Sequence, residues 1–396
     1  MQTFFSLLLL FIFSPLIYSL SHSSEVIHSW ISLDFLWESE SQKSLYLKSG
    51  LFIPENCAIT GIKTYKNEIY VTVPRWLRGV PSTLNKIENI NERSPLLTPF
   101  PSWNHQNISN PNGFKYIQSM EIDSKGRMWI IDVGRLNIAD DPQSVINGPA
   151  KIVILDLKTL EIIKYLEISD DVAPYNSSFL NDIVLDEERG FAYISDTSGA
   201  IIIYDFNNNF AKRWRSVTMK NEPNVNFTID GIDYGNKQFT TPVDGIALTR
   251  TGNQLFYCAL QGLHLYTIET KYLRDFSFND YFLETKIKNI GLKKSPSDGM
   301  TIGREEDILY FGGLTTDSLY SWNITQEFSP ENQKVEEQNN ENLHWIDTFA
   351  WMNDRDLLMT TNKLDLFLTK KMDFTGRQGA NFKILKKEMK RRKKEK

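Results

Sequence analysis

The sequence is poor in the residues that bind transition metals or form disulfides. Its 396 residues include only two cysteines, Cys57 and Cys258, and five histidines. The histidines lack the spacing of metal ligands and no CxxC pair is present, which argues against a structural zinc site or a His-based catalytic metal. The sequence also lacks a nucleophile elbow, a phosphate-binding loop and a thiol redox motif. We therefore expect no cofactor of these kinds and no catalytic centre that a motif would reveal.

A long apolar run occurs at the N-terminus, over residues 4–17, and small residues follow it. The run is too short for a membrane span and is typical of a secretory signal, although its first residues lack the usual positive charge. We expect residues 1–20 to be a signal peptide, the protein to be secreted and extracellular, and no transmembrane segment to be present. Four sequons are compatible with glycosylation in that pathway: Asn107, Asn176, Asn226 and Asn323.

The organisation of the chain is clearest in residues 180–206, LNDIVLDEERGFAYISDTSGAIIIYDF. An alternating strand, a charged turn with Gly190, a second strand, a Thr-Ser-Gly turn and a third strand follow one another as in an antiparallel meander. The same pattern returns in residues 58–87, 120–157, 243–268, 297–323 and 346–368. Six units result.

The spacing of these units indicates the architecture. An acidic residue opens the inner strand of the last four, and the steps between them are 62 residues (182 to 244), 54 (244 to 298) and 49 (298 to 347). Such steps are typical of propeller blades with insertions. We predict an all-β, six-bladed β-propeller with a central channel over residues 25–385. Cys57 and Cys258 then lie in the first and fourth blades, where a mutual disulfide would need an unusual reach across the fold, and we expect two buried thiols.

Charge is distributed unevenly along the chain. The net charge is −5, yet residues 386–396 carry eight positive and two negative charges. We expect this basic segment to be a disordered tail, with contact to anionic surfaces as its functional alternative. Aromatic interleaving is absent there, so no sequence-specific nucleic acid partner is expected. Two insertions, 207–241 and 326–343, are expected to be surface loops, the first covering one mouth of the propeller.

Acidic residues at the starts of the inner strands form the first candidate site. Asn181-Asp182, Asp244, Asp298 and Asp347 should converge at one end of the channel. Oxygen ligands around an axis suit Ca²⁺, so Asn181, Asp244 and Asp298 are an alternative metal site. The structural alternative is that these side chains cap turns and bind backbone groups of the next blade.

Several separated motifs resemble the yellow and major royal jelly protein family. They are YVTVPRWLRGVPSTL at residues 70–84, RMWIIDVGR at 127–135, PAKIVILDL at 149–157 and YSWN at 320–323. The resemblance extends from about residue 30 to 382 and implies a secreted six-bladed propeller. Members of that family bind biogenic amines in the channel, take part in pigmentation and dopachrome conversion, or are nutritive or structural glycoproteins, so the fold does not choose among these functions.

The resemblance also implies a ligand site. Amine-binding members carry a polar pair in the last blade, and Thr348 and Asn362 look like the matching positions, with the backbone carbonyl of Leu364 beside them. A protonated amine needs oxygen acceptors in an enclosed site and an apolar or aromatic wall for its ring. Small-ligand binding without a catalytic centre is therefore the first hypothesis. The alternative for Thr348 and Asn362 is that they only satisfy backbone groups at strand ends.

An enzymatic hypothesis rests on a second resemblance. NDIVLD and VDGIAL are similar to motifs of the regucalcin/gluconolactonase and paraoxonase propellers, where a divalent ion polarises a lactone and a carboxylate acts as general base. Asp244 and Asp298 would then be catalytic, in a lactonase-like hydrolase or a dopachrome-type isomerase. Those families also use a first-blade Glu, for which Glu55 is a weak candidate. A structural or nutritive secreted glycoprotein remains the third hypothesis.

Other repeated positions are expected to be structural. Arg75 and Arg135 each follow a strand end, and we expect them to bridge blades by ion pairs. Aromatic or large apolar side chains recur in the second strand of successive units, which indicates an interblade core. They are Trp129, Tyr193, Phe256, Tyr310 and Met359.

Overall fold

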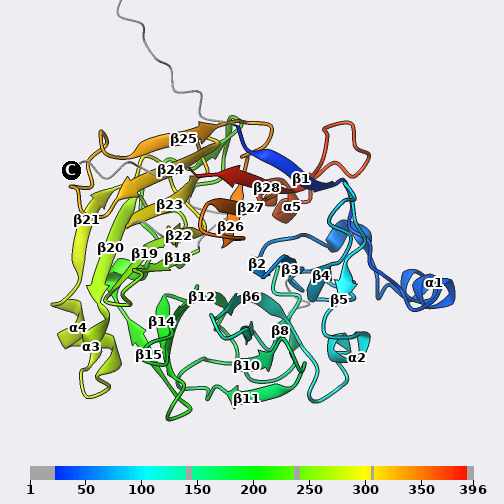
Figure 1. Cartoon of the computed structure of the whole chain (residues 1–396), viewed down its shortest axis with the longest axis horizontal. Helices are drawn as coiled ribbons and strands as arrows, with labels where there is room; N and C mark the ends of the chain where they lie inside the picture. Colours follow the sequence, from blue (N-terminus) through cyan, green and yellow to red (C-terminus); the bar gives the residue numbers. More distant parts are fainter. Residues whose placement is uncertain (1–22, 140–144, 236–240, 305–306, 390–396) are drawn as a thin grey trace, which may run out of the picture.

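The structure is a computed structural model that describes residues 23–139, 145–235, 241–304 and 307–389. Its described part is built mainly of six antiparallel sheets of four strands each, arranged in a ring (Figure 1). Each inner strand contacts the inner strands of both neighbouring blades, so the ring closes around a central channel. The six-bladed propeller is thus confirmed. The predicted signal peptide and residues 390–396 lie outside the described residues.

The blades follow one another along the chain, each from its inner to its outer strand. Blade 1 comprises β2 (Ile62–Tyr65), β3 (Glu68–Thr72), β4 (Leu84–Ile87) and β5 (Thr98–Pro99). Blade 2 comprises β6 (Ile117–Ile122), β7 (Arg127–Asp132), β10 (Lys151–Asp156) and β11 (Ile162–Glu167). Blade 3 comprises β12 (Leu180–Asp186), β13 (Phe191–Asp196), β14 (Ala200–Asp205) and β15 (Phe210–Arg215).

The remaining blades have the same antiparallel order. Blade 4 comprises β18 (Val243–Leu248), β19 (Gln254–Ala259), β20 (His264–Glu269) and β21 (Lys288–Leu292). Blade 5 comprises β22 (Met300–Ile302), β23 (Ile308–Gly313), β24 (Ser318–Asn323) and β25 (Lys334–Gln338). Blade 6 comprises β26 (Ile346–Trp351), β27 (Asp356–Thr361), β28 (Phe382–Glu388) and β1 (Glu25–Trp30).

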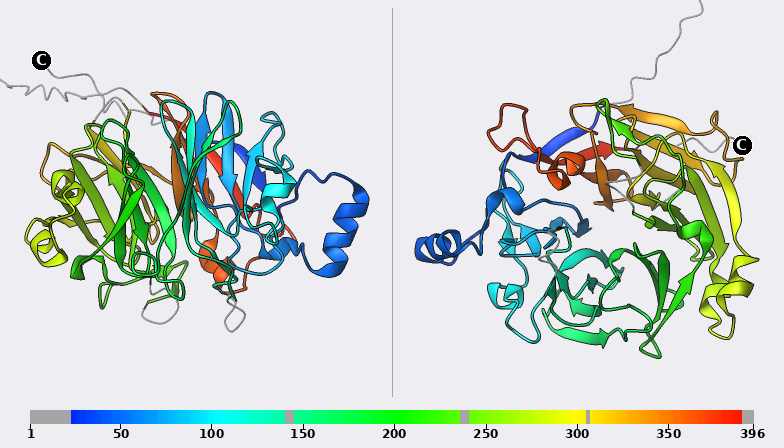
Figure 2. Two further views of the ribbon diagram at one scale, coloured as in Figure 1. Left: turned by 90° about the horizontal axis from the view of Figure 1, so that it is seen from below. Right: turned by 180° about the vertical axis from the view of Figure 1, so that it is seen from behind.

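Short helices and ribbons occupy the connections. The helices are α1 (Glu40–Ser49), α2 (Trp103–Gln106), α3 (Thr270–Arg274), α4 (Asp280–Glu284) and α5 (Leu364–Leu368), with 3₁₀ turns η1 (Pro54–Asn56) and η2 (Val217–Met219). The two-stranded ribbons are β8 (Arg135–Leu136) with β9 (Val145–Ile146), and β16 (Thr228–Ile229) with β17 (Ile232–Asp233). α1 has no buried residue and projects from the side of the ring (Figure 2). No helix within the described ranges is long and apolar enough to cross a membrane.

The ring is closed by strands from both ends of the described chain. β1 pairs with β28 in antiparallel register, from Glu25 opposite Lys386 to Trp30 opposite Phe382. The pattern of the last unit predicts a third strand near residues 364–368, and this prediction is wrong because the segment forms α5. Helical spacing lets Leu364 and Phe367 pack together into the core, which an extended LDLFL segment would not allow.

Two boundaries differ from the sequence-based expectation. The predicted start of the disordered tail, residue 386, lies too early in the sequence, because β28 continues through Glu388. Lys387 is buried there and forms a 2.7 Å ion pair with Glu337 of β25. The insertion at 326–343 is also not a simple loop, because β25 supplies the outer strand of blade 5. Sheet completion thus orders both polar segments, despite their composition.

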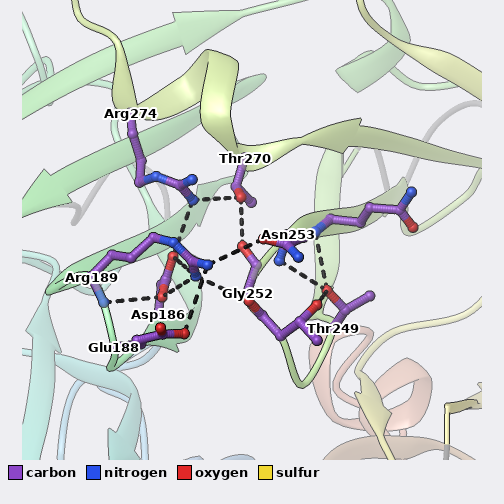
Figure 3. A network of polar contacts seen from close by, with 10 residues as sticks. Asp186, Glu188, Arg189, Thr249, Gly252, Asn253, Thr270 and Arg274 are labelled. Carbon is purple, nitrogen blue, oxygen red and sulfur yellow. Dashed lines mark hydrogen bonds and ion pairs between the residues drawn. The ribbon is translucent and has the colours of Figure 1, made fainter.

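Adjacent blades are joined by buried polar contacts as well as by apolar packing. Between blades 3 and 4, the buried carboxylate of Asp186 accepts from Arg189 and from Arg274 of α3, each at 3.1 Å (Figure 3). Arg189 also donates to the Thr251 backbone carbonyl at 3.0 Å. Because these groups come from different blades, the network fixes one blade against the next.

The repeated second-strand side chains and the two arginines have structural roles, but the arginines act through backbone carbonyls instead of the expected ion pairs. The second-strand side chains from Trp129 to Met359 are buried in the core clusters. Arg75 joins blades 1 and 2 through backbone carbonyls, including those of Phe114 at 2.8 Å and Lys115 at 2.7 Å, and not through the expected ion pair. Arg135 donates to the Ser178 carbonyl at 3.2 Å. Cys57 and Cys258 are both free and buried, as predicted.

Candidate functional site: the central channel and its two ends

The channel has two different ends because its six inner strands all run in the same direction. Residues at the starts of these strands line one end, and residues near their last positions line the other. We call the first the closed end and the second the open mouth. Asp182 borders the cavities at both ends, so these cavities are successive levels of one channel.

The closed end is covered by an apolar plug. Phe227, Ile229 and Tyr234, from the insertion that carries β16 and β17, are buried in the same cluster as Trp345 and Phe367. The rings of Phe227 and Trp345 lie 6.1 Å apart, centroid to centroid. The insertion therefore covers one mouth of the propeller, as expected from its position in the sequence.

Beneath the plug, the predicted convergence of acidic residues is found. Asn181 Nδ2 donates to Asp244 Oδ1 at 2.7 Å, and Trp345 Nε1 donates to Asp298 Oδ2 at 2.7 Å. Asn181, Asp244 and Asp298, with Asp182 and Asp347, line a space of about 10 Å³, close to the size of one water molecule. We call this group the aspartate cluster.

Burial controls the protonation of the aspartate cluster. It raises the pKa of Asp244 to about 7. Burial and the neighbouring Asp244 hold the pKa of Asp298 well above its usual range, and burial and Asp298 do the same for Asp347. Like charges that share a dry site cannot all ionise. The raised pKa values of Asp298 and Asp347 favour protonated carboxyl groups in this cluster, and a protonated carboxyl group can donate to a neighbouring one.

The arrangement of these oxygens does not favour Ca²⁺. The donor set is chemically suitable, since it consists of oxygens. However, the carboxyl groups are engaged by Asn181, Trp345 and Asn362, and no three His, Cys, Asp or Glu side chains in the described ranges are arranged to hold one ion. We derive no metal-dependent step from this group, and calcium binding stays a prediction. Glu55 is exposed in η1, outside both channel cavities, so it does not supply a first-blade metal ligand.

The structure brings two of the three predicted ligand residues onto one carboxyl group. Thr348 Oγ1 donates to Asp347 Oδ1 at 3.1 Å, and Asn362 Nδ2 donates to Asp347 Oδ2 at 2.9 Å. Asn362 Nδ2 also donates to the Ile59 carbonyl at 2.9 Å, while its buried Oδ1 accepts no hydrogen bond. Leu364 packs in the apolar plug at the start of α5.

The open mouth is the largest cavity near the axis, with a volume of about 770 Å³. Its floor contains a salt bridge between Lys63 Nζ and Glu121 Oε2 at 2.9 Å, and the carboxyl group of Asp182. Met300 and Phe349 belong to its lining, but their side chains are almost wholly buried because they pack in the cores between the blades. A volume of this size accommodates a small organic molecule.

The charges on this floor influence one another. Burial lowers the pKa of Lys63, but the carboxylates of Glu121 and Asp182 outweigh burial and leave that pKa raised. Burial raises the pKa of Asp182, and the attraction of Lys63 does not cancel the effect. Asp182 Oδ1 also accepts from the Ile183 amide at 2.9 Å and from Ser119 Oγ at 3.2 Å. The floor thus combines one ammonium group that stays protonated, that of Lys63, with two carboxyl groups that can accept hydrogen bonds, those of Glu121 and Asp182.

Lys63 and Glu121 were missed in the sequence. Each is a charged residue inside an inner strand, in IKTY and IQSMEI respectively. A charge within the innermost strand of a blade is the signal that would have pointed to them, because one face of that strand lines the channel.

An all-β ring of six blades around a central channel defines this protein as a six-bladed β-propeller. The family model described as major royal jelly protein matches residues 117–396. The chain therefore belongs to the major royal jelly protein family, which confirms the resemblance found in the sequence.

Named relatives cover most of the chain. Major royal jelly protein 1 of Apis mellifera is 25% identical over 394 residues, spanning 93% of this chain and 88% of the relative. Dopaminechrome tautomerase of Drosophila melanogaster is 26% identical over 387 residues, spanning 91% and 81%. Protein yellow of Drosophila subobscura is 24% identical over 382 residues, spanning 90% and 64%. The relatives thus include both an enzyme and proteins named without an activity.

Proposed function

We propose that this protein is secreted and binds a small aromatic amine in its central channel, which the ligand enters through the open mouth. The N-terminal apolar run and the family support secretion. The observation that carries the binding proposal is the floor of the open mouth, where Glu121 and Asp182 line a cavity of about 770 Å³.

The chemistry of the floor fits an ammonium group. A protonated amine that leaves water needs acceptors with negative charge. Glu121 and Asp182 provide them, and for Glu121 the amine would share the carboxylate with Lys63, which lies 2.9 Å from it. Asp182 is hydrogen-bonded to its own strand and to Ser119, so it is already oriented. Binding a cation there would favour the ionised form of Asp182 and lower its pKa.

The walls and rim fit the rest of such a molecule. Phe349 and Met300 border the cavity, and a ring would contact the small part of each side chain that packing in the blade cores leaves accessible. Lys66 and Arg304 are exposed at the rim and can donate to phenolic oxygens at the far end of the ligand. A catecholamine or an indole amine has this sequence of groups: ammonium, ring, hydroxyl.

Thr348, Asn362 and Leu364 define a deeper position in this proposal. A ligand whose ammonium group passes Asp182 would approach Thr348 and the carboxyl group of Asp347. The space there is about 10 Å³, so it admits the ammonium group and not the ring. The shallow and the deep position therefore depend on different residues.

Calorimetric titration with dopamine, serotonin and tryptamine tests the proposal. Glu121→Gln should weaken amine binding by about tenfold, the loss of roughly one charge-assisted contact. Catechol and indole, which lack the amine, should bind weakly to all variants. Equal loss in Thr348→Ala or Asn362→Ala, with no effect of Glu121→Gln, would place the amine in the deep position. No saturable binding of any amine would refute the proposed function.

A second candidate function, isomerisation of an aminochrome, is favoured by the raised pKa of Asp182 next to Lys63 and Glu121. Converting dopaminechrome to 5,6-dihydroxyindole moves two protons from ring carbons to the two quinone oxygens, with no net change in composition or oxidation level. A carboxylate can take such a proton, and a lysine ammonium or a protonated carboxyl can supply one. The named relative from Drosophila melanogaster is consistent with this class of reaction.

The decay of aminochrome absorbance measures this activity directly. Asp182→Asn should lower the enzymatic rate by about 100-fold and Thr348→Ala should leave it nearly unchanged. A wild-type rate equal to the spontaneous rate would exclude the second function and leave amine binding in place.

A further inference from the structure

A second cavity lies away from the channel, beside the last blade. Its volume is about 660 Å³, and it is lined by residues of β1 and β28, by the start of α5 and by the loop that precedes β26. β1, β28 and α5 lie next to one another at one side of the ring (Figure 1). Three cationic side chains contribute to its lining: Arg93, Lys363 and Lys383.

Lys383 is the most unusual of the three. It is 9% exposed, and its ammonium group donates to the Glu341 carbonyl at 2.6 Å and to Asn342 Oδ1 at 2.8 Å. Neither partner carries a charge. A buried ammonium group without a counter-ion is unfavourable, because neutral acceptors replace only part of its hydration.

The other two cations are held in a similar way. Lys363 Nζ donates to the Gln378 carbonyl at 2.8 Å. Arg93 donates to Ser29 Oγ at 3.0 Å and to the Val26 carbonyl at 2.8 Å. Across the ranges that the structure describes, none of the three forms an ion pair with a carboxylate.

Two acidic residues also line this cavity, Asp230 and Glu341, and the carboxylate of Asp230 contacts two other lining residues. Asp230 lies 3.5 Å from the imidazole of His344 and accepts from Asn340. Glu341 is exposed, and its backbone carbonyl is the group that contacts Lys383. Burial lowers the pKa of Lys383, and Lys363 and Arg93 lower it further against the opposing effect of Glu341. Lys363 and Arg93 thus act against the charge of Lys383, whereas the pKa of Lys363 itself is lowered by burial and raised by the charges of Asp373, Asp365 and Asp230.

We propose that Arg93, Lys363 and Lys383 bind a tetrahedral oxyanion, a sulfate or phosphate group, in this cavity. Such a group accepts several hydrogen bonds at once from ammonium and guanidinium donors and supplies the missing negative charge. The cavity volume of about 660 Å³ leaves room for a small molecule that carries the sulfate or phosphate group. This site is independent of the channel and of the function proposed for it.

Thermal shift and calorimetry with sodium sulfate, sodium phosphate and a sulfated disaccharide test the site, with sodium chloride at equal ionic strength as the reference. Wild type should bind sulfate or phosphate saturably, and Lys383→Met should weaken that binding by at least tenfold. Arg93→Gln, a change at an exposed side chain, should weaken it by several-fold and serves if Lys383→Met does not fold. Lys212→Met is the matched control, since Lys212 also donates to backbone carbonyls, those of Phe276 and Phe278, in a different blade.

The outcomes are distinct. Tighter binding of the disaccharide than of inorganic sulfate supports the site and assigns it to a sulfated saccharide, whereas equal binding supports it and assigns it to the free ion. The proposal is overturned if sulfate and phosphate act no differently from chloride. It is also overturned if Arg93→Gln and Lys363→Met bind the anions as wild type does.

Discussion

Replacing His344 with asparagine should destabilise the protein in a way that depends on pH. His344 is buried between the plug and the last blade, and its Nε2 lies 2.8 Å from Asp365 Oδ1. Its Nδ1 faces Asp230 at 3.5 Å and Asp317 at 3.9 Å. Asp365 also accepts from Tyr234 of the insertion at 3.1 Å, so the histidine helps to hold the plug on the ring.

The magnitude follows from the burial of this pair. A hydrogen bond between charged groups contributes about 1.5–3 kcal/mol, and a buried carboxylate left without its partner costs about 3–5 kcal/mol. Asparagine can still donate one hydrogen bond to Asp365. We therefore expect His344→Asn to lower the free energy of unfolding by about 2–4 kcal/mol near pH 6.

The sign of the pH dependence follows from the direction of the pKa shift. Burial alone would lower the pKa of His344, but the hydrogen bond and charge of Asp365, with Asp230 and Asp317, leave it raised above 6.5. A raised folded-state pKa contributes stability that is complete below the unfolded-state value and is lost as pH rises through the folded-state value. The difference between wild type and variant should therefore be largest below pH 6.5 and shrink at higher pH.

Urea unfolding followed by tryptophan fluorescence, repeated between pH 5 and pH 9, measures this difference. His264→Asn is the control, because His264 lies 3.0 Å from Glu222 but is more exposed, and its loss should cost less. A constant difference between wild type and His344→Asn at every pH would show that His344 acts only by packing. The same result would refute the assigned role of its charge.

Three further predictions concern the channel and the surface. Gly299→Ala should destabilise the protein by about 1–3 kcal/mol in chemical unfolding, because a Cβ there would lie 2.2 Å from the Asp347 carbonyl oxygen; Gly235→Ala, which meets only a side-chain oxygen at 2.9 Å, should cost less. EDTA should leave the melting temperature unchanged if the aspartate cluster is satisfied by its neighbours alone, and a fall that Ca²⁺ reverses would support the alternative metal site. Asn226→Gln should remove one glycan from the secreted protein, because Asn226 is exposed, and an unchanged mass would show that this sequon is unused.

Much of the ring could be predicted because its units repeat the same local pattern. Alternating strands, charged turns and an acidic residue at the inner strand recur in residues 180–206 and later units, and each signal is local in the sequence. The convergence of Asp244, Asp298 and Asp347 followed from symmetry alone. Because the same local strand pattern repeats, the arrangement of the blades in a ring could be predicted from short sequence segments.

The closing strand and α5 could not be predicted in the same way. β1 lies outside the repeat period, and its neighbour Ile31 accepts from Asn381, 350 residues away. The apolar run of Leu364–Leu368 is too short for periodicity to distinguish helix from strand. In both cases tertiary packing decides the structure.

The residues at the floor of the open mouth could not be predicted from the sequence, for a related reason. Which face of an inner strand lines the channel depends on register, and one charged side chain in a short strand does not reveal it. Lys63 and Glu121 are recognised as a pair only when β2 and β6 are adjacent. The predicted residues Thr348 and Asn362 came from family resemblance, and their role in binding stays a prediction.

The pairing of β1 with β28 also sets an order of events during synthesis. β1 leaves the ribosome before any blade and has no partner until β28 emerges. Until then it is an unpaired apolar edge strand, a state prone to aggregation. Ser24, just before β1, is tied to Glu337 of blade 5, so late-made segments hold the early strand in place. The natural order keeps β26, β27 and β28 consecutive and leaves β1 at the far end of the chain. A permuted chain that joins β28 to β1 and begins between β1 and β2 would place all four strands of the last blade in consecutive sequence and should fold with less delay.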